Sequence, residues 1–211
     1  MSYAINEVFY SLQGEGYHSG RAAVFCRFSG CNLWSGHETD RAGAICKFCD
    51  TDFVGTQGKG GGKFKTALEL SNHVLSFWPS DLSEKPFIVC TGGEPLLQLD
   101  RELIDAFHNS GMEIALETNG TIIPPAGIDW ICVSPKANSA LLVNSGDEIK
   151  IIYPQNGIDP ADYLKLDFSH FFLQPMDSPI LKLNTIETVN YCKTNQDWKL
   201  SLQIHKYLGI S

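Results

Sequence analysis

The chain has 211 residues, of which 43% are hydrophobic and 19% are charged. This is the composition of an ordinary globular protein, and the length suits a single domain over residues 1–211. The formal net charge is −8, and no cluster of Lys and Arg provides the basic face that a phosphate backbone requires. Direct nucleic-acid binding is therefore not expected, and a small-molecule substrate is favoured.

The cellular location is predicted from what the N-terminal segment and the cysteines indicate. Residues 1–7 show no charged region followed by an apolar one, as in a signal peptide, and no apolar run approaches the length of a membrane span. A cytoplasmic protein without a membrane partner is expected. In that compartment seven cysteines favour metal binding or catalysis over disulfides, and the odd count agrees.

Short apolar segments alternate with helical patterns along the chain. Strands are expected at residues 22–28, 87–90, 114–116, 130–133, 149–152, 171–173 and 200–203. Helices are expected at residues 67–77, 100–109 and 185–193. A Gly-rich segment at about 29–65 carries three cysteines, and loops of this length are usually functional. Short buried strands separated by helices indicate a parallel sheet.

Polar residues follow almost every predicted strand. They are Thr91, His205 and residues 117–119, 134–136 and 174–177. In a parallel α/β barrel such positions share the rim at the C-terminal ends of the strands, where active sites form. Six or so strands are too few for a full eight-stranded barrel. The sequence therefore predicts an α/β fold with a partial parallel β/α barrel of about six strands.

Three cysteines form the most informative motif. Cys46 and Cys49 make a C-x-x-C pair, and Cys31 lies upstream with fourteen residues in between. Three soft thiolates suit either an iron–sulfur cluster or zinc, and His37 is a possible fourth ligand of a structural zinc site. A four-iron cluster held by three thiolates keeps one iron open, and an open iron can bind a reactant.

Two features favour the iron–sulfur cluster. Phe48 and Asp50 flank the last cysteine, and they supply the apolar cover and the hydrogen-bond acceptor that a ligand on an open iron needs. Gly92 and Gly93 directly follow a predicted strand and let the backbone approach a ligand closely. The carboxylate of Glu94, next in the chain, suits an ammonium group. Together these features predict an enzyme whose cofactor supplies the difficult chemistry.

These motifs resemble those of radical S-adenosylmethionine enzymes and, within that superfamily, of the 7-carboxy-7-deazaguanine synthase family. The resemblance covers essentially the whole chain. Its carriers are residues 11–16, 25–28, 30–34, 46–52, 91–95, 117–120, 133–136, 174–177 and 203–206. The commonest superfamily signature is C-x-x-x-C-x-x-C. This chain departs from it in the first gap, and the synthase family includes members with such an expanded gap.

The resemblance implies positions for three cofactors and one substrate. Cys31, Cys46 and Cys49 would hold one 4Fe–4S cluster, whose open iron binds S-adenosyl-L-methionine, and Thr51 would ligate Mg²⁺ together with the substrate. The implied cofactor-binding residues are Phe48, Cys49, Asp50, Gly92, Gly93, Glu94, Ser134, Pro135, Lys136, Gln174, Pro175, Met176 and Asp177. The implied substrate-binding residues are Leu12, Gln13, Gly14, Glu15, Arg27, Thr91, His205 and Ser211.

The resemblance also implies a reaction. It converts 6-carboxy-5,6,7,8-tetrahydropterin to 7-carboxy-7-deazaguanine by hydrogen abstraction, ring contraction and loss of ammonia, in the biosynthesis of queuosine-type 7-deazapurines. A homodimer is implied, as is a reducing partner such as a flavodoxin or ferredoxin. A C-terminal tail at about 204–211 would close the active site.

Several residues have plainer interpretations that stay open. Arg27 lies within an apolar strand and either holds a substrate carboxylate or forms a structural ion pair with a nearby Asp. Glu117 is a candidate general acid/base or sugar ligand, and His205 is a candidate catalytic or core residue. The Thr51 hydroxyl also suits a turn cap. Core packing is favoured for Cys26, Cys90 and Cys132.

Two other classes of protein remain as alternatives. One is a different radical enzyme, such as a glycyl-radical activase, which would share the cluster and the glycine motif. Gln13, Arg27 and Thr51 speak against it, because a protein substrate needs no carboxylate clamp. The other is a zinc-binding interaction module without catalysis. Within the long insert, Trp34 and Ile45 predict that part of it packs against the body.

Overall fold

The computed structural model describes residues 2–210, whose strands form one nine-stranded sheet. The strands are β1 (Tyr3–Leu12), β2 (Ala22–Phe28), β3 (Gly62–Phe64), β4 (Phe87–Gly92), β5 (Glu113–Thr118), β6 (Trp130–Val133), β7 (Ser145–Tyr153), β8 (Asp167–Pro175) and β9 (Trp198–Leu200). Their order in the sheet is β3-β1-β2-β4-β5-β6-β7-β8-β9. β1 pairs antiparallel with β2 and β3, and all other pairs are parallel. The predicted partial barrel is confirmed, but the sheet has nine strands where about six were expected, because β1 and β3 add an antiparallel edge.

Helices follow the strands as the predicted alternation requires. They are α1 (Ala67–Leu75), α2 (Arg101–Asn109), α3 (Leu181–Thr194) and α4 (Ile204–Leu208), with short 3-10 helices η1 (Glu38–Gly43), η2 (Pro95–Leu97) and η3 (Pro160–Tyr163). Side chains cap the first two helices, because Thr66 accepts from the Glu69 N–H and Asp100 from the Leu103 N–H. No helix within residues 2–210 is long and apolar enough to cross a membrane.

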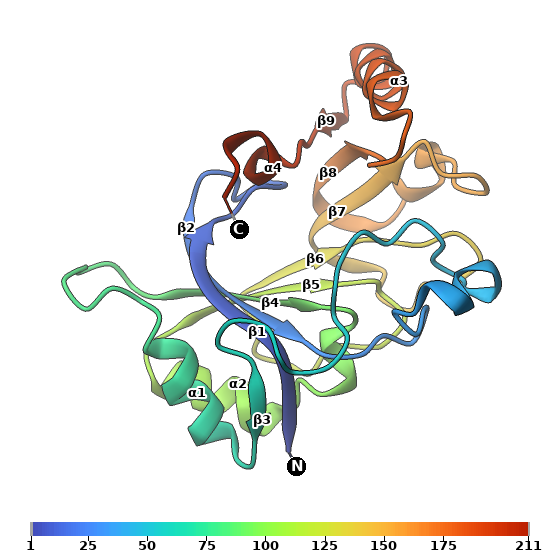
Figure 1. Ribbon diagram of the computed structural model, residues 1–211. Coiled ribbons are helices and arrows are strands. Elements are labelled where there is room, and N and C mark those ends of the chain that lie inside the picture. The colour runs from blue at the N-terminus through green and yellow to red at the C-terminus, as the bar shows by residue number, and fades with distance from the viewer. Residues whose placement is uncertain (1, 211) are drawn as a thin grey trace.

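The sheet has two different faces because successive side chains of a strand point to opposite sides. On β4, Ile88 and Cys90 pack with the buried side chains of α1 and α2 in the largest core cluster. Phe87 and Val89 pack on the other, concave face with aromatic residues of β1 and β2. Figure 1 shows the sheet bending, with α1 and α2 on its outer side and α4 beside the loop between β1 and β2.

The structure differs from the sequence-based expectation at the N-terminus and in the long insert. No strand was expected before residue 22, yet β1 occupies Tyr3–Leu12. The register of β1 shifts between Ile5 and Glu7, so the apolar alternation changes phase within the strand. In the insert, Trp34 is buried as predicted, but Ile45 is exposed, so its predicted packing is wrong.

Candidate active site

A cavity of about 660 Å³ lies at the C-terminal ends of the parallel strands. Most of the predicted site residues line it: Leu12, Gln13, Gly14, Glu15, Arg27, Cys31, Cys46, Phe48, Cys49, Asp50, Thr51, Thr91, Gly92, Gly93, Glu117, Ser134, Lys136, Gln174, Pro175, Asp177 and His205. Glu94, Pro135 and Met176 are not among its lining residues. Ser211 lies outside the described residues. The position agrees with the rule that parallel α/β sheets bind ligands at this edge.

The three motif cysteines lie on one wall of this cavity. The Cys46 thiol hydrogen-bonds to Cys49, and this contact, which outweighs the opposing effect of burial, lowers the pKa of Cys49 to about 6. The backbone N–H of Thr51 also stabilises the Cys49 thiolate. Burial raises the pKa of Cys31. The hydrogen bond to Cys49 and burial raise the pKa of Cys46 well above its ordinary value. Three thiols that line one cavity are the soft ligand type that an iron–sulfur cluster requires.

A zinc site with His37 as the fourth ligand does not fit this geometry. The His37 side chain is exposed and is not among the residues that line the cavity. Within residues 2–210, no three His, Cys, Asp or Glu side chains gather closely enough to hold a single metal ion. In an iron–sulfur cluster each thiolate binds a different iron, so the thiolates need not converge on one point.

The glycine motif holds the cysteine wall close to the sheet. A Cβ on Gly93 would lie 2.2 Å from the Gly30 carbonyl oxygen and 2.8 Å from the Cys31 Cβ. A Cβ on Gly92 would lie 2.4 Å from the Phe28 carbonyl oxygen. The two glycines thus let the backbone after β4 pack directly against the backbone at residues 28–31. Their predicted role in ligand binding is a separate matter.

Glu94 has internal partners in this structure. Its side chain is fully buried and accepts hydrogen bonds from the Leu96 N–H, the Thr118 hydroxyl and the Asn119 N–H. Burial still raises the pKa of Glu94 above its ordinary value. The carboxylate therefore joins the loops after β4 and β5, and its predicted contact with an ammonium group stays a prediction.

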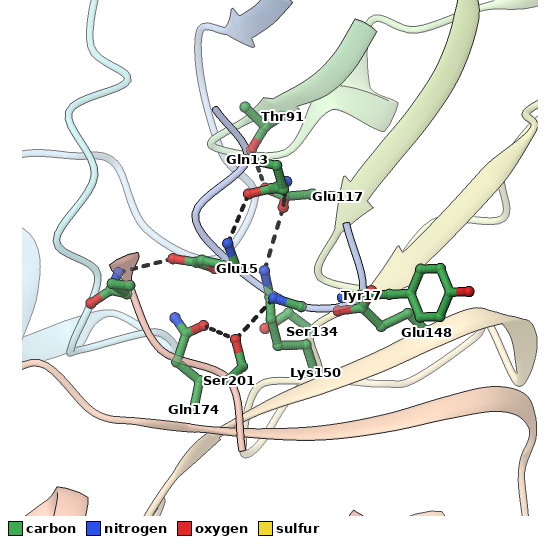
Figure 2. Close-up of polar contacts among 12 residues, drawn as sticks. Gln13, Glu15, Tyr17, Thr91, Glu117, Ser134, Glu148, Lys150, Gln174 and Ser201 are labelled. Atoms are coloured by element: carbon green, nitrogen blue, oxygen red, sulfur yellow. Dashed lines mark hydrogen bonds and ion pairs between the residues drawn. The ribbon is translucent and has the colours of Figure 1, made fainter. Parts of the chain in front are cut away.

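A network of polar side chains, which we call the polar wall, lines the same cavity (Figure 2). Glu117, at the end of β5, accepts hydrogen bonds from Gln13 at 3.2 Å and from Thr91 at 3.0 Å. Lys150 of β7 donates to Glu15 at 2.6 Å and to Glu117 at 3.4 Å. Three strands and the loop after β1 therefore meet at one charged cluster.

The ion pairs in this network stabilise the charged forms of Glu15 and Lys150. Burial opposes ionisation of Glu15, but the Lys150 ammonium and hydrogen bonds from Lys150 and Gln203 lower its pKa to about 2. Burial disfavours the charged form of Lys150 as well, yet Glu117 and Glu15 hold its pKa well above the ordinary value. The site thus presents two carboxylates bridged by one ammonium group.

Arg27 forms a structural contact on the same rim. Its Nε donates to Glu7 Oε1 at 2.7 Å, and both residues line the cavity. The partner is a Glu on the neighbouring strand β1, where the sequence-based alternative named an Asp. The ion pair is therefore present, and the predicted contact with a substrate carboxylate stays a prediction.

The C-terminal helix α4 lies over the edge of the cavity. Its first N–H, from Ile204, donates to the Gly14 carbonyl at 3.0 Å. The Lys206 ammonium contacts Asp50 of the cysteine loop at 2.6 Å and also Asp177, which follows β8. Gln203 donates to Glu15 at 3.0 Å. The tail therefore contacts the cysteine loop, the segment after β8 and the polar network.

Sequence reasoning missed Lys150 as a site residue, although a signal was present. Lys150 interrupts the apolar run of residues 149–152. The same signal, a cation within a buried strand, had singled out Arg27. Its partner Glu15 lies 135 residues away in the sequence, so only the fold shows that they meet. Cys132 is buried as expected, and it also lines the cavity.

Comparisons with known proteins decide the family. The chain is 56% identical over 210 residues to the 7-carboxy-7-deazaguanine synthase of Burkholderia multivorans, and the alignment covers 100% of both proteins. The chain belongs to the 7-carboxy-7-deazaguanine synthase family. It is also 41% identical to the synthase of Bacteroides thetaiotaomicron, over 98% of this chain and 97% of that protein.

A solved structure agrees with this assignment, although no family model matches the chain. The crystal structure of QueE from Escherichia coli superposes with a TM-score of 0.71 at 26% identity, over 97% of this chain and 95% of that one. The predicted family, enzyme class and fold are thereby confirmed. Membership of the 7-carboxy-7-deazaguanine synthase family implies radical S-adenosylmethionine chemistry with a 4Fe–4S cluster.

Proposed function

We propose that the chain converts 6-carboxy-5,6,7,8-tetrahydropterin to 7-carboxy-7-deazaguanine, with loss of ammonia, in the biosynthesis of queuosine-type 7-deazapurines. One observation carries the assignment of the site. A single cavity is lined both by the three motif cysteines and by the Gln13, Glu15 and Glu117 network. The family name of the relatives supplies the reaction.

The cysteine wall is the cofactor side of the cavity. Cys31, Cys46 and Cys49 would hold one 4Fe–4S cluster, with Ser134, Lys136 and residues 174–177 lining the space for S-adenosylmethionine. When bound, these cofactors supply a carbon radical that removes a hydrogen atom from the substrate. Lys136 donates to the Ser134 carbonyl and hydroxyl oxygens at 2.6 and 2.7 Å, which fixes this cation beside the cysteine wall.

The polar wall is the substrate side. Amide and carboxylate groups from Gln13, Glu15 and Glu117 suit the ring nitrogens of a pterin, which carry both donors and acceptors. Arg27 suits the substrate carboxylate through a bidentate contact. Because Lys150 holds Glu15 ionised, that carboxylate accepts hydrogen bonds without taking a proton. The chain's residues thereby orient the substrate, and Glu117 remains the candidate acid/base.

Further parts of the proposal concern the cation, the tail and the assembly. Thr51 lines the cavity and would ligate Mg²⁺, which commonly takes few protein ligands and completes its shell with substrate and water. Residues 204–211, with Ser211 outside the described part, would close the site, so removal of residues 206–211 would cut turnover and leave the cluster intact. The chain would act as a single-domain homodimer in the cytoplasm, reduced by a flavodoxin or ferredoxin.

One anaerobic assay tests the proposed function. Reconstituted, reduced protein is mixed with S-adenosylmethionine, Mg²⁺ and 6-carboxytetrahydropterin, and the products are identified by mass spectrometry. We expect 7-carboxy-7-deazaguanine from the parent protein and none from Cys49→Ala. Formation of 5′-deoxyadenosine without that product, with or without the pterin, would leave the radical cofactor in place and refute the substrate.

A further inference from the structure

A second, much smaller cavity lies directly behind the polar network. Its volume is about 10 Å³, which is just enough to hold one water molecule. It shares four lining residues with the large cavity, namely Gln13, Glu15, Glu117 and Cys132. These four residues therefore border both spaces. The rest of its wall is His18, Phe87, Val89, Ala115, Leu116, Trp130 and Glu148.

Two buried polar atoms of lining residues have no hydrogen-bond partner within residues 2–210. They are Glu148 Oε1 and His18 Nε2. Glu148 is only 3% exposed, and its other oxygen, Oε2, accepts from the Tyr17 N–H at 3.1 Å (Figure 2). An unpaired buried polar atom costs about 1–3 kcal/mol. The Cys132 thiol also hydrogen-bonds to the Glu148 carboxylate. A water molecule both donates and accepts hydrogen bonds, so it suits either of the two unpaired atoms.

An aromatic cluster packs around His18 and Trp130, two residues that line the small cavity but not the large one. Tyr17 stacks on Trp130 with ring centroids 4.9 Å apart and on His170 at 4.3 Å. The His18 ring lies edge-on to Trp130 at 4.4 Å. The small cavity is therefore lined both by this aromatic cluster, through His18 and Trp130, and by the candidate acid/base Glu117.

The residues around the small cavity are suited to proton transfer. Glu148 precedes Lys150 by two residues on β7, so the two side chains leave the same face of the strand. Burial raises the pKa of Glu148 above its ordinary value, so this carboxylate takes up a proton more readily than an exposed one. Glu117 lines the same cavity and borders the proposed substrate.

We propose that this cavity is a binding site for one water molecule, held by Glu148 and His18, and that this water passes protons between Glu117 and Glu148. Glu117, when protonated, gives its proton to the water oxygen while the water gives one of its own protons to Glu148 Oε1. One O–H bond breaks and one forms at each step, and the water is regenerated. The relay rests on the proposed function, because the substrate loses a carbon-bound proton when the ring becomes aromatic.

The water site is tested directly by a crystal structure of the full chain at a resolution that shows ordered solvent. We expect one solvent peak within hydrogen-bonding distance of both Glu148 Oε1 and His18 Nε2. We also expect the peak to vanish in Ala115→Val, whose larger side chain fills the cavity. An empty cavity, or a direct contact between the two side chains in the parent protein, would overturn the site.

The relay is tested with Glu148→Gln. The amide keeps the size of the side chain and an acceptor for the Tyr17 N–H, but it does not take up a proton. We expect kcat to fall about tenfold or more with KM unchanged and with a larger solvent deuterium isotope effect. The matched control is Asp147→Asn, the adjacent carboxylate, which accepts from the Ile131 N–H at 2.8 Å.

Two results distinguish the relay from the proposed function. If Glu148→Gln has the kcat and isotope effect of the parent, the relay is wrong and the proposed function stands. If the reconstituted parent protein makes no 7-carboxy-7-deazaguanine, the proposed function is wrong and the relay falls with it. In that second case the water site is decided by the crystal density alone. Iron content and melting temperature of each variant exclude loss of the cluster or of the fold as the cause.

Discussion

At the scale of the residue, Gly93 illustrates how tightly the sheet and the cysteine loop are joined. In Gly93→Ala the new Cβ meets backbone and Cβ atoms at 2.2 and 2.8 Å, and these atoms cannot rotate away. We expect a loss of about 1–3 kcal/mol in the free energy of unfolding. Denaturant titration measures it, with Gly43→Ala as control because no atom lies within 4 Å of a Cβ there. Equal free energies of unfolding in the two variants would show that the cysteine loop moves away from the new Cβ without loss of stability.

Lys150 is the residue on which the charge balance of the polar wall depends. Lys150→Met keeps the length of the side chain but leaves Glu15 and Glu117 without their shared cation. Removing one partner of a buried ion pair costs about 3–5 kcal/mol. We expect a loss of that size in urea unfolding at pH 7, whereas Lys199→Met on the exposed side of β9 changes little. A small loss would mean that water reaches the carboxylates.

The same pair predicts how stability depends on pH. The pKa of Glu15 is about 2 in the folded protein and 4.5 in its ordinary state. Its contribution to stability is therefore fully present above about pH 4.5 and is lost as the pH falls towards 2. In Lys150→Met the unpaired carboxylates gain from protonation, so the stability gap between parent and variant should narrow over this range. A constant gap from pH 7 to pH 3 would show that the charge of Glu15 is not what Lys150 stabilises.

At the scale of the element, α4 is too short to be stable by itself, so its contacts hold it in place. Lys206, whose side chain is 40% exposed, joins α4 to Asp50 and Asp177. Exposed ion pairs contribute about 0.2–1 kcal/mol each. We expect Lys206→Met to make the tail several-fold more sensitive to protease and to raise KM more than it lowers kcat. The control is Lys182→Met on α3, and added salt should reproduce the effect in the parent if the contact is electrostatic.

The elements that sequence reasoning found and missed differ in a physical way. The strand around Ile88 is a continuous apolar run, because both faces of the parallel sheet are covered there. β1 also carries apolar residues, but the register shift between Ile5 and Glu7 breaks their alternation. β3 has three residues and contains Gly62, so no pattern marks it. Packing partners, and not local preference, define these two strands.

At the scale of the whole molecule, the two walls of the site differ in how visible they are in the sequence. Cys46 and Cys49 are separated by two residues, and their chemistry follows from their spacing alone. The polar wall joins Gln13 to Glu117 and Glu15 to Lys150 over 104 and 135 residues. An isolated charged residue in the sequence could pair with any of many distant residues, so its partner cannot be predicted from the sequence. Only the closure of the parallel strands brings them together, and the same closure creates the small cavity beside Glu148.

The arrangement of the whole chain also predicts how the cluster affects the fold. Residues 29–65 contain only η1 and the short strand β3, so a cluster bound by Cys31, Cys46 and Cys49 would tie this loop to the sheet. A ligand that binds only the folded state raises its stability. We expect anaerobic reconstitution with iron and sulfide to raise the melting temperature and to protect residues 29–65 from protease. About four irons per chain should bind.

Two variants serve as controls for this prediction. Cys49→Ala should show neither the rise in melting temperature nor the protection from protease, whereas Cys192→Ala on α3, outside the site, should show both. Protection in Cys49→Ala equal to that in the parent would mean that the loop is held by its own packing, which includes the edge-on contact between Trp34 and Phe53.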